Sequence, residues 1–240
     1  MTDWTSLWDF DDPSASERRL RAAAEGDPGG RDVMLTQVAR ALGLQQRYDD
    51  AAAILDAIVS DDPEVTARRH LERGRLLRSS GSPAESRPHF ERAAAVAATA
   101  GQEALQIDAL HMLALVAEPE QALAITADAL ALARAATEQA AIDWDASLLN
   151  NLGMTHADAG DFEAALPLFE EALAARERIG DRTRTRVARW MIGWCLRELG
   201  RPAEALRVQR ELKADLDSTG DHDPYVDEEL ALLEAGQTRR

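Results

Sequence analysis

Apolar residues along the chain recur every three or four positions, which is the spacing of an amphipathic α-helix. Ala, Leu, Glu and Arg, all strong helix formers, are abundant, whereas aromatic residues make up only 5% of the chain. No stretch alternates Val, Ile, Thr or Tyr with polar residues as a half-buried strand does. The pattern therefore predicts an all-α protein.

The helical pattern is organised in repeats. One unit contains Leu152-Gly153, Gly160 and Ala165, and small residues return 40 positions later at Gly193, Gly200 and Ala205. The small residue of each first helix is expected to let the second helix approach closely. Gly160 and Gly200 are expected to end the first helices in a left-handed cap. Each unit should thus be a helical hairpin.

This unit resembles the tetratricopeptide repeat family, whose pattern is W-x-x-L-G-x-x-Y…A-x-x-x-F…P. Weaker matches upstream contain Val38-Ala39, Arg73-Gly74 and Leu113-Ala114, so the resemblance covers about residues 32–217 in five units. It implies a right-handed α-solenoid of about five antiparallel helix pairs with flanking terminal helices. Small-residue spacings near 40, as in kinesin light chains and bacterial peptide-sensing regulators, predict long second helices. The third unit lacks about one turn, so we expect shortened helices there.

Three regions follow from this pattern. Residues 1–30 form an acidic-aromatic segment and a short helix over residues 13–25, and residues 31–220 form the repeat array. Residues 221–240 form a capping helix and tail, with a helix expected from residue 224 to about residue 235. The run from Asp215 to Glu234 carries eight acidic residues and no basic one, as suits a solvated cap.

Charge and targeting signals limit the partners. The formal net charge is −16, which argues against nucleic acid and anionic membranes. No run approaches the roughly 18 apolar residues of a membrane span, and the acidic N-terminus is unlike a secretory signal. We therefore expect a cytoplasmic protein. Arginine outnumbers lysine, present only as Lys213, which is typical of a GC-rich bacterial genome.

We find no arrangement of residues that indicates catalysis. Cys195 is the only cysteine, and the five histidines lack the paired spacing of a zinc helix. The glycines of residues 26–30 lack the Gly-Lys-Ser/Thr ending of a phosphate-binding loop. The sequence predicts no metal and no cofactor, although an enzyme with an unrecognised site stays an alternative.

The family resemblance implies that first helices line a concave groove where ligands bind. We expect the groove to contain the residues near the small position of each first helix: Arg40, Arg68, Arg75, Arg78, His111, Asn150, Asn151, Met154, Trp190, Trp194 and Arg197. Arginine and tryptophan are enriched at binding hot spots, so we predict a scaffold or adaptor for an acidic, partly apolar protein segment. Two alternatives stay open. The tryptophans and arginines could only pack and pair internally, or the chain could be a small-peptide-sensing regulatory module.

Two further segments lie outside the repeat pattern. Trp4 to Asp12 is acidic and aromatic, so it could cover the end of the first repeat, or dock in the groove of its own chain or of a second copy. The arginines between Arg176 and Arg189 could contact an acidic partner, or form a solvated hairpin balanced by the acidic C-terminal region.

Overall fold

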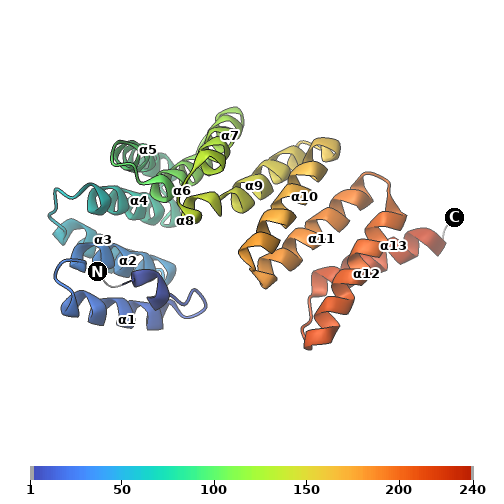
Figure 1. The fold of residues 1–240 in the computed structure, drawn as a ribbon, viewed down its shortest axis with the longest axis horizontal. Helices are drawn as coiled ribbons and strands as arrows, with labels where there is room; N and C mark the ends of the chain where they lie inside the picture. Colours follow the sequence, from blue (N-terminus) through green and yellow to red (C-terminus); the bar gives the residue numbers. More distant parts are fainter. Residues whose placement is uncertain (1–2, 239–240) are drawn as a thin grey trace. The chain divides into compact units, whose positions relative to one another are not determined.

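The computed structural model describes residues 3–238, which contain helices and no strand (Figure 1). The predicted all-α class is therefore confirmed. The chain divides into two compact units, residues 1–141 and residues 142–240, and each is described by itself. The predicted terminal regions also include residues 1–2 and 239–240, which lie outside the described residues. The boundaries predicted at residues 30 and 220 stay a prediction.

The first unit begins with a short 3-10 helix, η1 (Trp4–Leu7), and continues as helices that each pack on the next. These helices are α1 (Pro13–Gly26), α2 (Arg31–Leu44), α3 (Tyr48–Ala57), α4 (Pro63–Ser79), α5 (Pro83–Thr99), α6 (Glu103–Ala114) and α7 (Pro119–Ala135). Helix α2 also packs on α4, so the first helices of neighbouring hairpins form a continuous face. The short helix α8 (Gln139–Ile142) spans the boundary between the units.

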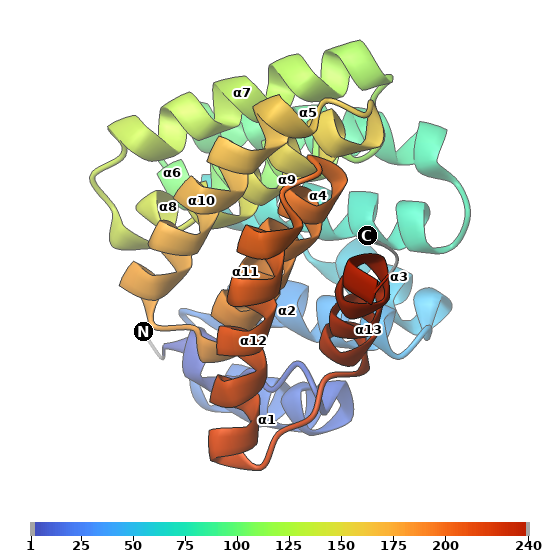
Figure 2. The same cartoon turned by 90° about the vertical axis from the view of Figure 1, so that its right-hand side faces the viewer.

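The second unit contains two hairpins and a final helix. Its helices are α9 (Asp145–Asp158), α10 (Phe162–Ile179), α11 (Arg182–Glu198), α12 (Pro202–Thr219) and α13 (Pro224–Thr238). Helices α11 and α12 lie side by side in two perpendicular views (Figures 1 and 2), and α13 packs on both. The predicted helices at residues 13–25 and from residue 224 are both present as α1 and α13.

Local sequence signals account for where the helices begin and end. Asp161 and Asp181 each accept a hydrogen bond from the backbone N–H of the third residue beyond them, a standard N-cap. Gly160 and Gly200 have φ values of +79° and +69°, so the predicted left-handed caps are confirmed. The hairpin signals in the sequence therefore act at the positions predicted.

Helix lengths differ from the expectation in two places, α7 and α3. Helices α10 and α12 each contain 18 residues, as the long repeat spacing predicts. In the third hairpin α6 is shortened to 12 residues, but α7 contains 17. The expectation of a shortened second helix was wrong there, because the missing turn belongs to α6 alone. The shortest second helix is instead α3, with ten residues.

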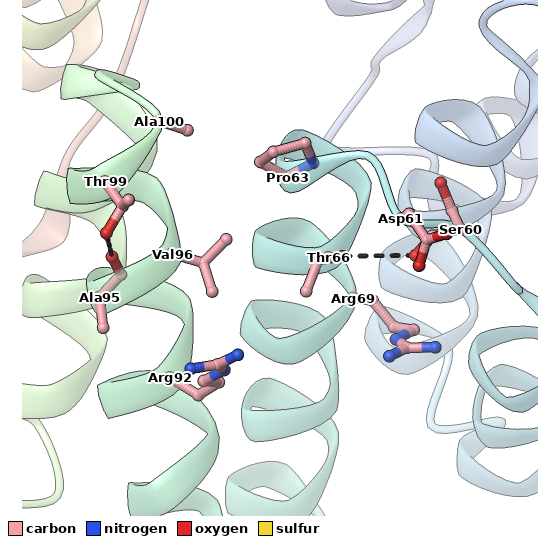
Figure 3. Close-up of a pocket in the computed structure, with 10 residues that line it drawn as sticks. All are labelled: Ser60, Asp61, Pro63, Thr66, Arg69, Arg92, Ala95, Val96, Thr99 and Ala100. Atoms are coloured by element: carbon pink, nitrogen blue, oxygen red, sulfur yellow. Dashed lines mark hydrogen bonds between the residues drawn. The ribbon is translucent and has the colours of Figure 1, made fainter.

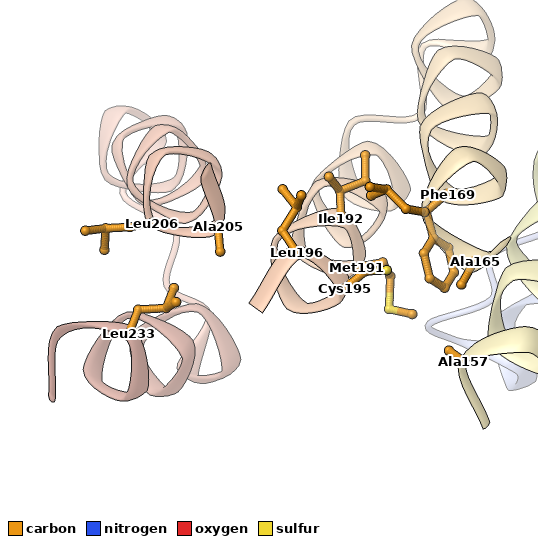
Figure 4. Packing of buried hydrophobic residues seen from close by; sticks show 11 residues of the cluster. Ala157, Ala165, Phe169, Met191, Ile192, Cys195, Leu196, Ala205, Leu206 and Leu233 are labelled. Carbon is orange, nitrogen blue, oxygen red and sulfur yellow. The ribbon is translucent and has the colours of Figure 1, made fainter. Parts of the chain in front are cut away.

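Each unit has its own apolar core between the helices. In the first unit, one cluster surrounds Leu20, Leu42 and Leu55, and another surrounds Phe90. In the second unit, α10 and α11 meet around Phe169, Met191 and Cys195 (Figure 4). No helix among the described residues is both long and apolar enough to span a membrane.

The small residues of the first helices allow the close contact that the sequence predicts. A Cβ atom added to Gly74 would lie 2.4 Å from Cε1 of Phe90, and one added to Gly153 would lie 2.6 Å from Cε1 of Phe169. Both phenylalanines are buried on the second helix of the same hairpin. In the last hairpin Gln209 takes the place of the ring and would lie 2.4 Å from a Cβ at Gly193.

Substituting Gly74 by alanine should therefore destabilise the first unit. Alanine favours a helix by about 1 kcal/mol over glycine, but overpacking against Phe90 costs roughly 1–3 kcal/mol, so we expect a net loss of about 1 kcal/mol. Urea unfolding measures this loss, and Phe90→Leu in the Gly74→Ala background should recover part of it. Gly26→Ala is the matched control, since an added Cβ there meets nothing within 4 Å. Equal midpoints for the two alanine variants would contradict the contact.

Candidate functional site

The predicted groove residues divide between the two units. Arg40 lies on α2, three arginines (Arg68, Arg75 and Arg78) lie on α4, and His111 lies on α6. We call the surface of α2, α4 and α6 that carries them the first-helix face. The second unit holds the other six residues: Asn150, Asn151 and Met154 on α9, and Trp190, Trp194 and Arg197 on α11.

A buried charge cluster lies at the centre of the first-helix face. Arg75 donates to the carboxylates of Glu72 and Asp108, which come from its own helix and from α6. Arg40 Nη1 lies 4.0 Å from Glu72 Oε1, and Glu72 is only 2% exposed. Burial disfavours the charged form of Asp108, but Arg75 and Arg40 outweigh burial and lower its pKa. Burial, and then the neighbouring Arg75, lower the pKa of Arg40. Of the predicted arginines, Arg40 and Arg75 are thus held together by internal carboxylates.

A small cavity of about 180 Å³ opens beside this cluster. Arg40, Glu72, Arg75, Arg78 and Met112 are among its lining residues. Within the described residues the exposed Arg78 guanidinium has no ion-pair partner, and Glu72 Oε2 is a buried acceptor that receives no hydrogen bond. The cavity therefore offers a cationic group at the surface and an unused acceptor deeper inside.

The acidic-aromatic segment lies on the same face. The guanidinium carbon of Arg68 is 4.7 Å from the ring centroid of Trp4, and that of Arg40 is 5.7 Å from those of both Trp8 and Phe10. At this distance an arginine and an aromatic ring attract each other. The rings of Trp8 and Phe10 stack, with centroids 4.8 Å apart.

The same segment also covers part of the first core. Trp4, Leu7 and Trp8 pack against the cluster around Leu20 and Leu42. Its backbone is held on α1, because Arg19 donates to the carbonyl of Leu7 and the buried Ser16 hydroxyl donates to the carbonyl of Asp9. The sequence suggests two roles for this segment, to cover the end of the first repeat or to dock in the groove. In the structure it both covers part of the first core and contacts Arg40 and Arg68.

Removing Arg75 should destabilise the first unit, because Glu72 and Asp108 would lose their shared partner. Breaking a buried ion pair from one side costs about 3–5 kcal/mol, and the side chains here are 2–15% exposed, so we expect about 3 kcal/mol for Arg75→Ala in urea unfolding. The control is Arg78→Ala, three residues away on the same helix but exposed and unpaired in the described structure. It should change stability by less than about 0.5 kcal/mol. Similar losses for both variants would contradict a structural role for the cluster.

In the second unit the predicted tryptophans pack half-buried against the core. Trp190 and Trp194 stack with centroids 6.2 Å apart, and Trp194 also meets Phe162 edge-on. Trp190 Nε1 donates to the carbonyl of Tyr225 on α13 over 3.1 Å. Arg197 forms a bidentate pair with Glu229, also on α13, at 2.8 and 2.9 Å. Trp190 and Arg197 therefore hold α13 in place, and a role of these side chains or of Trp194 in ligand binding stays a prediction.

The remaining predicted residues of the second unit lie on α9. Asn150 lines a cavity of about 190 Å³ together with Arg176 and Arg184. Met154 packs against the core cluster of the unit, and Asn151 is half-buried one position after Asn150. The structure thus places Asn150 at a cavity and Met154 in the packing.

The arginines between residues 176 and 189 have partners. Arg182 and Arg186 both pair with Asp215 on α12, and Arg186 also pairs with Asp221. Arg178 pairs with Asp143 and Asp145. The acidic C-terminal region therefore neutralises Arg182 and Arg186, as one of the two interpretations of the sequence expects. The carboxylates that pair with Arg178, Arg184 and Arg189 lie outside that region.

Two histidines that the sequence analysis did not pair meet between α4 and α5. The Nδ1 atoms of His70 and His89 lie 3.1 Å apart. Burial, then His89 and the cationic side chains of Arg69, Arg92 and Arg73, lower the pKa of His70 to about 4. Burial and Arg73 also lower the pKa of His89. Their separation of 19 residues gives no local motif, so only the hairpin geometry reveals the pair.

This pair predicts a pH dependence of stability. The pKa of an unfolded histidine lies near 6.5, whereas the pKa of His70 in the folded chain is lowered to about 4. Between these values the unfolded chain binds more protons, so folding stability should fall as the pH drops from 6.5 towards 4 and level off below. In thermal melts between pH 7.5 and 5, His70→Gln should lose less stability than the unaltered chain. An unchanged pH slope for His70→Gln would contradict the inference.

A third cavity, larger than the other two, was also not predicted from the sequence. It measures about 630 Å³ and lies along α4 and α5 near the start of α4 (Figure 3). We call it the α4/α5 cleft, lined by Ser60, Asp61, Pro63, Thr66, Arg69, Arg92, Ala95, Val96, Thr99 and Ala100. No repeat motif marks it, because it depends on the length of α3 relative to α5.

The described residues show little that could perform catalysis. They contain no group of three or more His, Cys, Asp or Glu side chains that could hold a metal ion. Cys195 is buried, and burial, followed by Glu163 and other acidic neighbours, raises the pKa of its thiol to about 11. A thiol with so high a pKa is a poor nucleophile at neutral pH.

Comparisons with known proteins show that this chain is built of helical-hairpin repeats. Residues 35–109 and 144–214 each match a family model described as tetratricopeptide repeat, which together cover more than half of the chain. The chain belongs to the tetratricopeptide repeat family, as its repeats predict. Members of this family typically act as protein-binding scaffolds. Comparison with curated protein sequences gave no match.

Solved structures support the same fold at low sequence identity. BtubC (BKLC) from P. vanneervenii is 17% identical, with 93% of this chain and 95% of that chain covered and a TM-score of 0.68. A putative kinesin light chain with TPR-like repeats from Podosopora anserina is 15% identical, covering 80% and 97%, with a TM-score of 0.61. NprR in complex with its cognate peptide NprX is 15% identical, covering 93% and 66%, with a TM-score of 0.54. These likenesses show an all-α solenoid fold.

Proposed function

We propose that this chain is a protein- or peptide-binding scaffold whose first-helix face takes an acidic segment carrying aromatic side chains. One observation carries the proposal. The chain's own segment of that chemistry, Trp4 to Asp12, lies with its rings against Arg40 and Arg68. Five other residues of this segment are acidic or carry a hydroxyl group. The first-helix face therefore already contacts a segment that combines aromatic rings with polar side chains.

The chemistry of the face supports such a ligand. Arg40 and Arg68 attract aromatic rings through their faces, and Arg78 is available to a carboxylate within the structure described. The adjacent cavity is lined in part by Glu72, whose Oε2 is a buried acceptor without a donor. A face that can bind both aromatic rings and carboxylates suits a peptide, which can carry both groups, better than a small metabolite.

The fold supports binding rather than chemistry. In NprR, a protein of the same fold, the structure holds a cognate peptide. We extend that mode of use to this chain as part of the proposal, with Trp190, Trp194, Arg197 and the α9 residues Asn150, Asn151 and Met154 as further candidate contacts in the second unit. The cytoplasmic location and bacterial origin predicted from the sequence stay predictions.

The proposal predicts that the first twelve residues bind in trans. A fluorescein-labelled peptide of residues 1–12 should bind a chain that begins at Pro13, because its face is then uncovered. The full-length chain should bind the same peptide at least about tenfold more weakly, since its own segment competes at a high effective concentration. Fluorescence anisotropy measures both affinities, and circular dichroism checks that the shortened chain stays helical.

Matched variants separate the face from unspecific attraction. Arg68→Gln in the shortened chain should weaken binding, whereas Arg18→Gln, an exposed arginine on α1, should not. A peptide with Trp4, Trp8 and Phe10 replaced by alanine should bind weakly, because the ring contacts are lost. Equal affinity of the full-length and shortened chains for the peptide would show that the segment and the ligand do not share this face.

A further inference from the structure

The α4/α5 cleft exists because two neighbouring second helices differ in length. Helix α3 ends at Ala57, and an extended connection, residues 58–62, leads into α4. Helix α5 contains 17 residues against the ten of α3. Ser60 and Asp61 of the connection, rather than further turns of α3, therefore line the cleft together with residues from the last turns of α5 (Figure 3).

One end of the cleft is cationic. Arg69 of α4 and Arg92 of α5 lie at the same end, away from Pro63 and Ala100 (Figure 3). Arg69 uses Nη1 to donate to the carbonyl of Ile58 over 2.9 Å, which fixes its guanidinium at the wall. The exposed guanidinium of Arg92 makes no hydrogen bond or ion pair within residues 3–238. Most arginines of the described residues pair with a carboxylate, whereas Arg92, like Arg78, does not.

The surroundings add positive charge at this end. Arg69, Arg92 and Arg73 all act electrostatically on His70, which meets His89 just beyond the cleft. Arg73 is already paired with Asp56. Asp61 is the only carboxylate among the ten lining residues. The chain has a net charge of −16, but at this end of the cleft the local charge is positive and would attract an anion.

The other end of the cleft suits a peptide. Pro63, Ala95 and Val96 supply apolar surface, and Ser60, Thr66 and Thr99 supply hydroxyl groups. Thr99 donates to the carbonyl of Ala95 within its own helix, which leaves its oxygen able to accept a hydrogen bond. The volume of about 630 Å³ is large enough for several residues of an extended segment.

We propose that the α4/α5 cleft is a second binding site, which takes a short acidic segment of a partner protein. Carboxylates of the segment would pair with Arg92 and Arg69, and an apolar side chain would cover Val96 and Pro63. The site is separate from the first-helix face, because Arg69 points to Ile58 whereas the adjacent Arg68 points to Trp4. Successive helical residues are rotated by about 100°, so one helix can serve both sites.

A hexaglutamate peptide tests this proposal directly. Fluorescein-labelled hexaglutamate should bind the full-length chain at 50 mM NaCl, while hexaglutamine should not, and 300 mM NaCl should weaken binding because the attraction is ionic. Arg92→Glu should weaken hexaglutamate binding at least about tenfold, which is the loss of one charge-assisted pair. Asp61→Asn should strengthen it about two- to fivefold by removing a repulsive carboxylate.

Two charge-matched controls assign the site. Arg78→Glu places the same change on the first-helix face, and Arg18→Glu places it on α1, outside both sites. The proposal is supported when only Arg92→Glu weakens binding. It is overturned when Arg92→Glu and Arg18→Glu bind alike, when Arg78→Glu alone weakens binding, or when the unaltered chain does not bind. Equal affinity for free glutarate would also overturn it, since the cleft would then be a small-molecule site. None of these outcomes depends on the trans-binding of residues 1–12.

Discussion

Three hairpins of this protein, α4/α5, α9/α10 and α11/α12, each depend on a close approach between their two helices at one position. At Gly74 and Gly153 the backbone of the first helix lies against a phenylalanine ring of the second, with no room for a Cβ atom. The ring fills the space that the missing side chain leaves. The same contact therefore joins the two helices and contributes to the apolar core. In the last hairpin Gln209 replaces the ring, and its amide donates to the carbonyl of Trp190. The contact is thus kept while its chemistry changes.

That close packing turns particular side chains towards the surfaces between hairpins. Once α4 is held against α5, Arg75 is directed towards α6 and reaches Asp108, and Arg69 is directed towards the carbonyl of Ile58. The same geometry brings His70 to His89 across the hairpin. Helix pairing therefore brings together charged groups that are distant in sequence. On the first-helix face the arginines meet carboxylates, whereas between α4 and α5 they lie near the two histidines.

Much of the fold follows from local signals, whereas much of the site does not. The left-handed glycines at residues 160 and 200 and the helices at both ends were predictable, because caps and periodicity are properties of short segments. The partners of Arg40, Arg75 and Arg197 were not, since Glu72, Asp108 and Glu229 meet them only through packing of helices. The α4/α5 cleft depends on where α3 stops. No residue near Ala57 marks that end as strongly as Gly160 marks another.

An acidic ligand can bind an acidic protein because charges act over short distances in salt. The Debye length at physiological ionic strength is about 8 Å, so a bound carboxylate responds to nearby arginines more than to the net charge of −16. Most arginines here are already neutralised by neighbouring carboxylates, which removes unspecific attraction. Arg78 and Arg92 keep their charge without a partner in the described structure, on two different faces. Selectivity for acidic segments then rests on a few unpaired guanidinium groups rather than on the overall charge of the chain.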